Sequence, residues 1–211
     1  MILRFLHWVA SHGRVYDFIQ VAAGGRRIYA EVAARVPSDP PHAIVLDIGG
    51  GTGTLGRHLH SGCRYICLDL EEPKLRRFRQ KVPGGMGLLA DGARLPLPDG
   101  SVDTVVCAMV AHHLPEAVLK DVFAECQRVL RAGGRFIFLD WLRRVDRLPS
   151  RILCALDRGA HPYVAERLQQ LLENRFEIDR SDRLAIFHEY LLMVLRSKEP
   201  DRRANGHAPD S

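Results

Sequence analysis

The sequence predicts an α/β fold in which helices cover both faces of a doubly wound, mostly parallel sheet. Continuous apolar runs alternate with amphipathic segments along residues 43–141, which is typical of strands that are buried on both faces and joined by helices. A glycine-rich segment follows the first apolar run, at the carboxyl end of a strand, where sheets of this kind bind their ligands. Functional residues are therefore expected along this edge of the sheet.

Two helices are expected before the sheet. Apolar residues recur every three or four positions in residues 15–23 and 26–36, with a glycine pair between the two segments. The proline-rich stretch 37–41 ends this pattern before the first apolar run.

Five strands are expected next, at residues 43–48, 64–70, 85–90, 101–110 and 135–141. The helices between them are a short one that ends at Leu59, one that Pro73 opens, and one over residues 115–130. Pro115 marks the start of this last helix, and the pair Gly133–Gly134 marks its end.

The pattern changes after Asp140. Helices are expected at 148–159 and 163–173, followed by strands at 175–184 and 186–198 with no helix between them. Two strands joined by a short connection are antiparallel. One domain is expected over residues 1–198, and the polar residues 199–211 form a disordered tail.

Composition indicates a soluble globular protein, with 46% hydrophobic residues and no apolar run of the ~20 residues that a membrane span needs. The five cysteines include no C-x-x-C pair, which favours a reducing, cytoplasmic location and argues against a disulfide framework or a metal site. The net charge of +5 is spread over several segments. Solvated helix faces explain it better than a nucleic-acid groove. The amphipathic segment ILRFLHWV allows at most a peripheral membrane contact.

The glycine-rich segment fits two motifs. Counted from Gly51 it is G-x-G-x-x-G, a dinucleotide-binding pattern, and counted from Asp47 it is D-x-G-x-G-x-G. A carboxylate at position 47 repels a diphosphate by about 4 kcal/mol at 4 Å and an effective dielectric constant of 20. The same carboxylate attracts an ammonium group, so the sequence favours S-adenosylmethionine. With either motif, Asp69 is expected to accept hydrogen bonds from a ribose.

Four segments, LDIGGGTG, CLDLEE, ADGARLPLPDGSVDTVVCAMVAHHL and VLRAGGRFIFLD, resemble successive motifs of the class I S-adenosylmethionine-dependent methyltransferases. The sequence is most similar to the small-molecule group that includes the quinone-biosynthesis C-methyltransferases. The resemblance covers roughly residues 12–196. It implies a Rossmann-like, seven-stranded sheet with a C-terminal antiparallel hairpin, and a helical lid over residues 1–40.

The resemblance also implies a set of cofactor-binding residues. The residues expected around the amino-acid end of the cofactor are Asp47, Gly49, Gly51 and Gly53. The residues expected around the nucleoside are Asp69 at the ribose and Leu70, Asp91, Gly92 and Ala93 at the adenine. The residues expected beside the sulfonium are Ala108 and Met109, and Tyr16 belongs to the lid. Position 50 departs mildly from the pattern, because many relatives carry Cys or Ala there.

Two histidines are candidate catalytic residues. His112 and His113 follow the fourth strand, where acceptor and sulfonium should meet, and an imidazole can take a proton near neutral pH. The alternative is that they pack against the sheet or form hydrogen bonds with it. For Asp103, inside the fourth strand, stabilising the strand entry or facing solvent at the far end of the sheet is preferred to a functional role.

The predicted function is transfer of a methyl group from S-adenosylmethionine to a small, partly lipophilic acceptor. One alternative is a nucleic-acid or protein methyltransferase, which the positive net charge supports. Against it, the sequence has no N-P-P-[YF]-like tetrapeptide after the fourth strand. Another is a catalytically silent cofactor-binding subunit. The intact glycine segment and acids argue against that alternative. The sequence predicts no oligomeric state.

Overall fold

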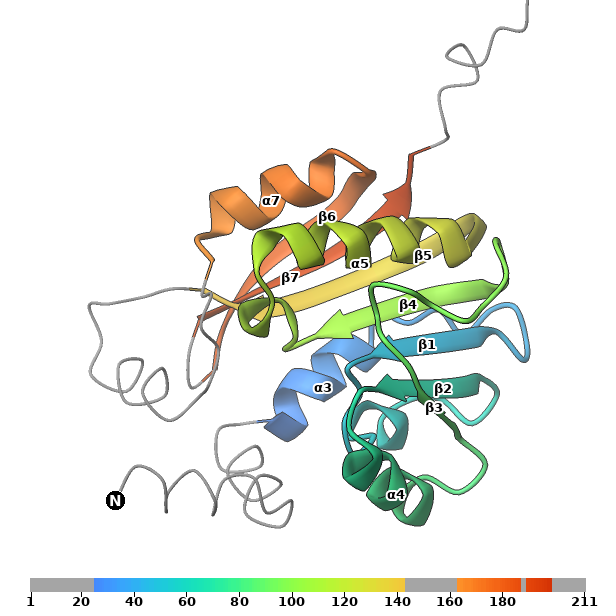
Figure 1. The fold of residues 1–211 in the computed structure, drawn as a ribbon. Coiled ribbons are helices and arrows are strands. Elements are labelled where there is room, and N and C mark those ends of the chain that lie inside the picture. Colours follow the sequence, from blue (N-terminus) through green and yellow to red (C-terminus); the bar gives the residue numbers. More distant parts are fainter. Residues whose placement is uncertain (1–24, 143–162, 187–188, 199–211) are drawn as a thin grey trace, which may run out of the picture.

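The structure, a computed structural model, describes residues 25–142, 163–186 and 189–198 (Figure 1). Its strands are β1 (Ile44–Ile48), β2 (Arg64–Asp69), β3 (Met86–Leu89), β4 (Val102–Ala108), β5 (Leu130–Trp141), β6 (Phe176–Ala185) and β7 (Glu189–Ser197). Its helices are α3 (Gly25–Ala33), α4 (Glu72–Lys81), α5 (Glu116–Val129) and α7 (Ala165–Glu173), with 3₁₀ turns η1 (Leu55–Arg57) and η2 (Ala111–His113). The helices expected at 15–23 and 148–159, and the tail, lie outside the described residues.

The strands form one seven-stranded sheet in the order β3-β2-β1-β4-β5-β7-β6. Neighbouring strands from β3 to β5 are parallel, whereas β7 is antiparallel to both β5 and β6. The predicted doubly wound, mostly parallel sheet with a C-terminal hairpin is thereby confirmed. Because β6 runs in the same direction as β5, its carboxyl end lies at the same edge of the sheet as those of β1–β5.

Helices cover both faces of this sheet, as the apolar strands require. On one face, α5 and α7 pack side by side (Figure 1), and the ring of Phe123 lies edge-on to Phe136 and Phe138 at 5.9 and 5.8 Å. On the other face, α3 contributes Ile28 and Val32 to a second core, which also includes side chains of α4. Two separate cores thus hold the edge that carries the glycine-rich turn.

Two expected helix boundaries differ from the structure. The helix expected to end at Leu59 is only the turn η1, which follows the left-handed Gly53 and ends at Arg57. The pair Gly133–Gly134 does not end a helix. It lies within β5, which starts directly after α5. Here the register with β4 jumps, and the glycines, Gly133 with φ +76°, form this irregularity.

None of the helices in the described part of the chain combines the length and apolar character that a membrane span requires.

Asp103 stabilises the entry of the neighbouring strand β1 and not that of its own strand β4. Its Oδ2 accepts a hydrogen bond from the amide of Ile44 at 2.8 Å, and both carboxylate oxygens bind Arg131 Nη1 at 2.6 and 2.7 Å. The carboxylate therefore joins β1 to the irregular part of β5 at the edge opposite the glycine turn.

We expect Asp103→Ala to lower the free energy of unfolding by about 1–3 kcal/mol, because a strand amide loses its charged acceptor. Asp179→Ala is the matched control, since Asp179 binds Arg196 at 2.7 Å on the exposed hairpin and exposed ion pairs contribute up to ~1 kcal/mol. Urea unfolding of both variants measures the difference. Equal losses would contradict the assigned role of Asp103.

Candidate functional site

The candidate site lies at the carboxyl ends of β1, β2 and β4. The chain proceeds from β1 to β2 and β3 on one side, and β4 pairs with β1 on the other side. This reversal of strand order is the switch point at which doubly wound sheets bind ligands. The register of Asp47 with Cys67 and Val106 brings the three strand ends to the same level.

The glycine turn between β1 and η1 is left-handed at three positions, Gly49, Gly51 and Gly53. A Cβ at Gly53 would collide with the ring of Phe78, so that position packs against α4. A Cβ at Gly51, where φ is +59°, would instead approach no atom closer than 4.0 Å. The turn thus leaves a hollow above Gly51 in which a ligand can approach the backbone closely.

Asp69 fixes one side of this hollow. Its Oδ2 accepts a hydrogen bond from the amide of Gly51 at 3.0 Å, and its Oδ1 accepts one from the amide of Glu71 at 2.9 Å. Lys74 Nζ lies 4.0 Å from Asp69 Oδ1 and 2.6 Å from Glu71 Oε1. Lys74 is a site residue that was not predicted from the sequence. A lysine one helical turn after the strand-end acid is the signal that could have found it.

Asp47 lies beneath the turn and is 2% exposed. Burial raises its pKa to about 7, and repulsion from Asp69 adds to this rise. The hydroxyl of Tyr65 donates a hydrogen bond to Asp47 Oδ2 at 2.5 Å, and this bond lowers the pKa of Asp47 and so opposes the rise. Tyr65 was also missed, although a tyrosine in a buried strand needs a partner for its hydroxyl.

Crowding beneath the turn explains why position 50 is a glycine. A Cβ there would lie 2.7 Å from Asp47 Oδ2 and 2.7 Å from Cys67 Sγ. The carboxylate and the thiol therefore occupy the space that a side chain at position 50 would need.

The residues expected at the adenine lie next to this hollow. The register of β2 with β3 brings Leu70 and Asp91 to the same end of the sheet, and both are exposed, Leu70 by 68%. Asp91 Oδ1 accepts a hydrogen bond from the amide of Ala93 at 2.9 Å. Gly92 is buried, and a Cβ there would lie 2.9 Å from Ile48 Cγ2.

Ala108 ends β4 beside the turn, and Met109 follows it. Met109 is a non-glycine residue with φ +62°, and its amide donates to the carbonyl of Leu139 at 2.8 Å. A left-handed backbone at such a residue is strained, and strain of this kind clusters at functional sites.

The structure separates the roles that are open to His112 and His113. His112 is 1% exposed, and its Nδ1 lies 2.6 Å from Asp140 Oδ1. Asp140 also accepts hydrogen bonds from the amides of His112 and Trp141, at 3.1 and 2.7 Å. A carboxylate only accepts hydrogen bonds, so Nδ1 of His112 carries a proton. His113 is exposed, and its ring lies 4.0 Å from that of His112.

Two further expectations concern this region. Tyr16 lies outside the described residues. Within those residues, no three His, Cys, Asp or Glu side chains are grouped as a metal site requires.

Comparison with known proteins agrees with this geometry. A family model described as a methyltransferase domain matches residues 46–138. The ubiquinone/menaquinone biosynthesis C-methyltransferase UbiE of Acidiphilium cryptum is 34% identical over 73% of this chain and 71% of its own. The malonyl-acyl-carrier protein O-methyltransferase of Methylococcus capsulatus is 40% identical over 47% of this chain, which spans 38% of that enzyme.

A solved structure shares the fold. The 1,6-didemethyltoxoflavin-N1-methyltransferase of Burkholderia thailandensis, with bound 1,6-didemethyltoxoflavin and S-adenosylhomocysteine, superimposes with a TM-score of 0.71 at 19% identity. The match covers 94% of this chain and 88% of that one. With the sequence relatives, it defines a class I, Rossmann-like enzyme. The chain belongs to the S-adenosylmethionine-dependent methyltransferases, and its cofactor is S-adenosylmethionine.

The raised pKa of Asp47 makes a prediction about stability without cofactor. The folded state holds this proton up to about pH 7, whereas an unfolded aspartate loses it near pH 4. The folded state binds more protons in this window, so rising pH lowers the free energy of unfolding. Asp47→Asn removes the loss, and we expect it to stabilise the protein at pH 8 by roughly 1–4 kcal/mol and to change little at pH 4.

Urea unfolding of both proteins at the two pH values measures this effect. A variant that is less stable than the wild type at pH 8 would show that the buried carboxylate is not a cost to folding.

Proposed function

We propose that this methyltransferase acts on a small, partly lipophilic acceptor. The observation that carries the proposal is an apolar group at the carboxyl edge of the sheet, on the side of α3. Its members come from α3, the residue after β4, β5 and the hairpin, and they are Tyr29, Met109, Trp141, Leu184, Ile186 and Tyr190. Tyr190 pairs with both Trp141 and Leu184 across the sheet. Trp141 and Tyr190 are each 1% exposed and form the base of the group, so the half-buried Tyr29, Met109, Leu184 and Ile186 are the members open to an apolar or aromatic acceptor.

The proposed cofactor contacts follow the sequence prediction. S-adenosylmethionine supplies a methyl group on a sulfonium, which is already strongly electrophilic. Asp69 accepts hydrogen bonds from the ribose, and the Gly51 hollow receives the amino-acid end close to Gly49 and Gly53. Asp47 beneath the turn attracts the ammonium group. Its pKa of about 7 means that a nearby positive charge favours the ionised form.

The nucleoside and the sulfonium lie on either side of the turn in this proposal. Asp91 accepts a hydrogen bond from the exocyclic amine of adenine, with Leu70, Gly92 and Ala93 around the ring. Ala108 and Met109 line the methyl end. We also retain Tyr16 as part of the lid, on the resemblance alone.

His113 is the proposed general base. It would take the proton when the group that is methylated is a hydroxyl, an acidic carbon or an ammonium. Its exposure in η2, which follows β4, supports this role. His112 is buried, bonded to Asp140 and in edge contact with Trp141 at 5.0 Å, which suits a positioning residue that holds η2. Most of the work of the protein is to orient the acceptor towards the methyl carbon.

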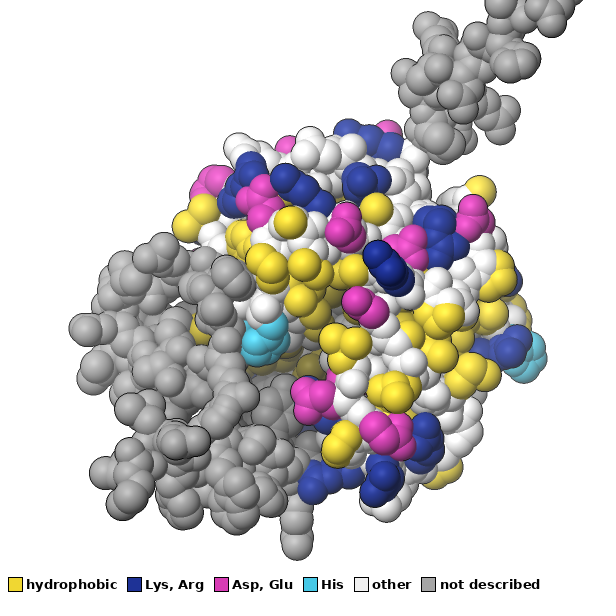
Figure 2. All heavy atoms as spheres, viewed as in Figure 1, with side chains coloured by type: hydrophobic (Ala, Val, Ile, Leu, Met, Phe, Trp, Pro, Cys, Tyr) yellow, Lys and Arg dark blue, Asp and Glu magenta, His cyan; other side chains and the backbone are white. Residues whose placement is uncertain are grey.

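The surface gives less support to a nucleic-acid substrate. Acidic and basic side chains alternate over α5 and α7 (Figure 2), where Glu116 binds both Arg167 and Lys120. These cations hold the pKa of Glu116 near 2, so the pairs are ionised at neutral pH. Nucleic-acid binding depends on unpaired cations that release counterions.

We propose a reducing, cytoplasmic location and no metal cofactor. The four described cysteines, Cys63, Cys67, Cys107 and Cys126, are free, which suits a compartment that keeps thiols reduced.

Gly51→Ala tests the cofactor site. The new methyl group would enter the hollow above the turn, so we expect affinity for S-adenosylmethionine to fall at least about tenfold. Gly84→Ala is the matched control, because Gly84 also has a positive φ of +83° with no atom within 4 Å of its Cβ position. Both variants carry the same backbone strain of about 1–2 kcal/mol. Calorimetric titration should show lost affinity for Gly51→Ala alone, and equal affinities would refute the assignment.

The acceptor class is tested by incubating the protein with S-adenosylmethionine and small quinones, phenols or polyketides, with RNA and a protein extract as competitors. We expect a mass gain of one CH₂ on a small molecule. With that acceptor, His113→Ala should lower kcat by about 10²-fold while leaving cofactor affinity unchanged.

Three outcomes of this assay separate the alternatives. Methylated RNA or protein would favour the polymer substrate. No methylation of any acceptor, with normal cofactor binding, would favour a silent subunit. An unchanged kcat in His113→Ala would remove His113 from the chemistry.

A further inference from the structure

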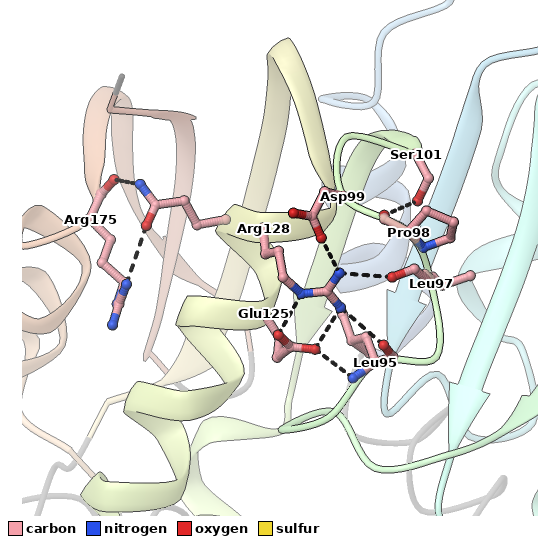
Figure 3. A network of polar contacts seen from close by, with 9 residues as sticks. Leu95, Leu97, Pro98, Asp99, Ser101, Glu125, Arg128 and Arg175 are labelled. Carbon is pink, nitrogen blue, oxygen red and sulfur yellow. Dashed lines mark hydrogen bonds and ion pairs between the residues drawn. The ribbon is translucent and has the colours of Figure 1, made fainter. Parts of the chain in front are cut away.

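One arginine of α5 organises the loop between β3 and β4 (Figure 3). Arg128 Nε and Nη2 bind the two oxygens of Glu125 at 2.7 and 2.8 Å. Nη2 also donates to the carbonyl of Leu95 at 3.0 Å, and Nη1 donates to the carbonyl of Leu97 at 2.8 Å and to Asp99 Oδ1 at 2.6 Å. All five N–H groups of the guanidinium are therefore used, in a fork that lysine cannot reproduce.

Leu95 is held twice by this pair. Its amide donates to Glu125 Oε2 at 2.6 Å, while its carbonyl accepts from Arg128. Its side chain is 5% exposed and lies in the core under α5. Arg128 also keeps the pKa of Glu125 below its usual value, so the carboxylate remains charged. The loop is thus fixed by backbone contacts at Leu95 and not merely covered by a side chain.

A four-residue turn, Asp91–Arg94, ends at this fixed point. The amide of Ala90 donates to the carbonyl of Asp69 at 3.3 Å, which fixes the start of the turn against β2. Within the turn, the amide of Arg94 donates to the carbonyl of Asp91 at 3.0 Å. The turn therefore has one attachment to the sheet and one to the Arg128–Glu125 pair.

We propose that Arg128 and Glu125 are positioning residues for the adenine end of the cofactor. By holding Leu95, they fix the conformation of the turn Asp91–Arg94. The exposed Asp91 carboxylate is thereby oriented towards the exocyclic amine. Neither residue touches the cofactor. The inference rests on the proposed function, in which adenine lies beside Asp91. A carboxylate held in place before binding loses less freedom when the ligand arrives, which increases affinity and selectivity.

The test compares S-adenosylhomocysteine with S-inosylhomocysteine, in which a carbonyl replaces the exocyclic amine. We expect the wild-type protein to bind the adenosyl form at least about tenfold more tightly, because a charged hydrogen bond is lost with the inosyl form. In Arg128→Lys and Glu125→Gln, we expect this ratio to fall to about threefold or less, since Asp91 is no longer held. Calorimetry measures each Kd.

Arg131→Lys is the matched control. Arg131 also forms a doubly bonded ion pair, with Asp103, but it does not contact the 91–99 loop in the described contacts. For Arg131→Lys, the ratio of the two dissociation constants should stay at the wild-type value. A merely structural role for Arg128 would weaken both ligands by the same factor and leave the ratio unchanged. Asp91→Asn should lower the ratio as well, and adding Arg128→Lys to it should cause no further fall.

Each failure has its own result. A wild-type ratio near one would show that adenine does not lie beside Asp91, and the inference would fall with that placement. A high ratio in the wild type that persists in both Arg128→Lys and Glu125→Gln would leave the placement intact and overturn the role of the pair. Glu125→Gln keeps the test decisive if Arg128→Lys does not fold.

Discussion

A buried carboxylate beneath a glycine turn is the constraint on which the rest of the site depends. Asp47 has little water around it, so its charge is disfavoured until a positive group comes near. Tyr65 holds the carboxylate from below, and the space that Asp47 and Cys67 fill dictates glycine at position 50. The turn can therefore lie directly on the carboxylate. A ligand with a phosphate bridge gains no such attraction, because a neighbouring negative charge keeps this carboxyl group protonated.

The second strand completes the site through backbone hydrogen bonds. Asp69 binds the amide of Gly51, so the end of β2 and the turn after β1 move together. Asp140 does the same at η2, where it binds the amide and ring of His112. In each case an acid at the end of one strand holds the loop that follows its neighbour. Loops that carry chemistry are kept in place in this way by the rigid sheet.

Much of this could be predicted from the sequence, because apolar alternation and strand-end acids are local signals. The succession of strands along the chain, the hairpin and the position of Asp69 at a strand end follow from such signals. The extent of β5 could not, because Gly133–Gly134 after a helix usually marks a helix end, and only the pairing with β4 shows the irregular strand. The difference between His112 and His113 depends on Asp140, 28 residues away from His112. The partnership of Tyr65 with Asp47 is likewise a contact between strands, which spacing along one strand does not reveal.

The position of β7 has a consequence for synthesis of the chain. Along the sequence β7 follows all the other described strands, yet in the sheet it lies between β5 and β6. While the ribosome still covers β7, β5 exposes an unpaired edge and β6 has no neighbour to bond with. Exposed edges of this kind pair with other chains. The nascent protein therefore passes through an aggregation-prone stage that ends only when residues 189–197 leave the exit tunnel and close the sheet.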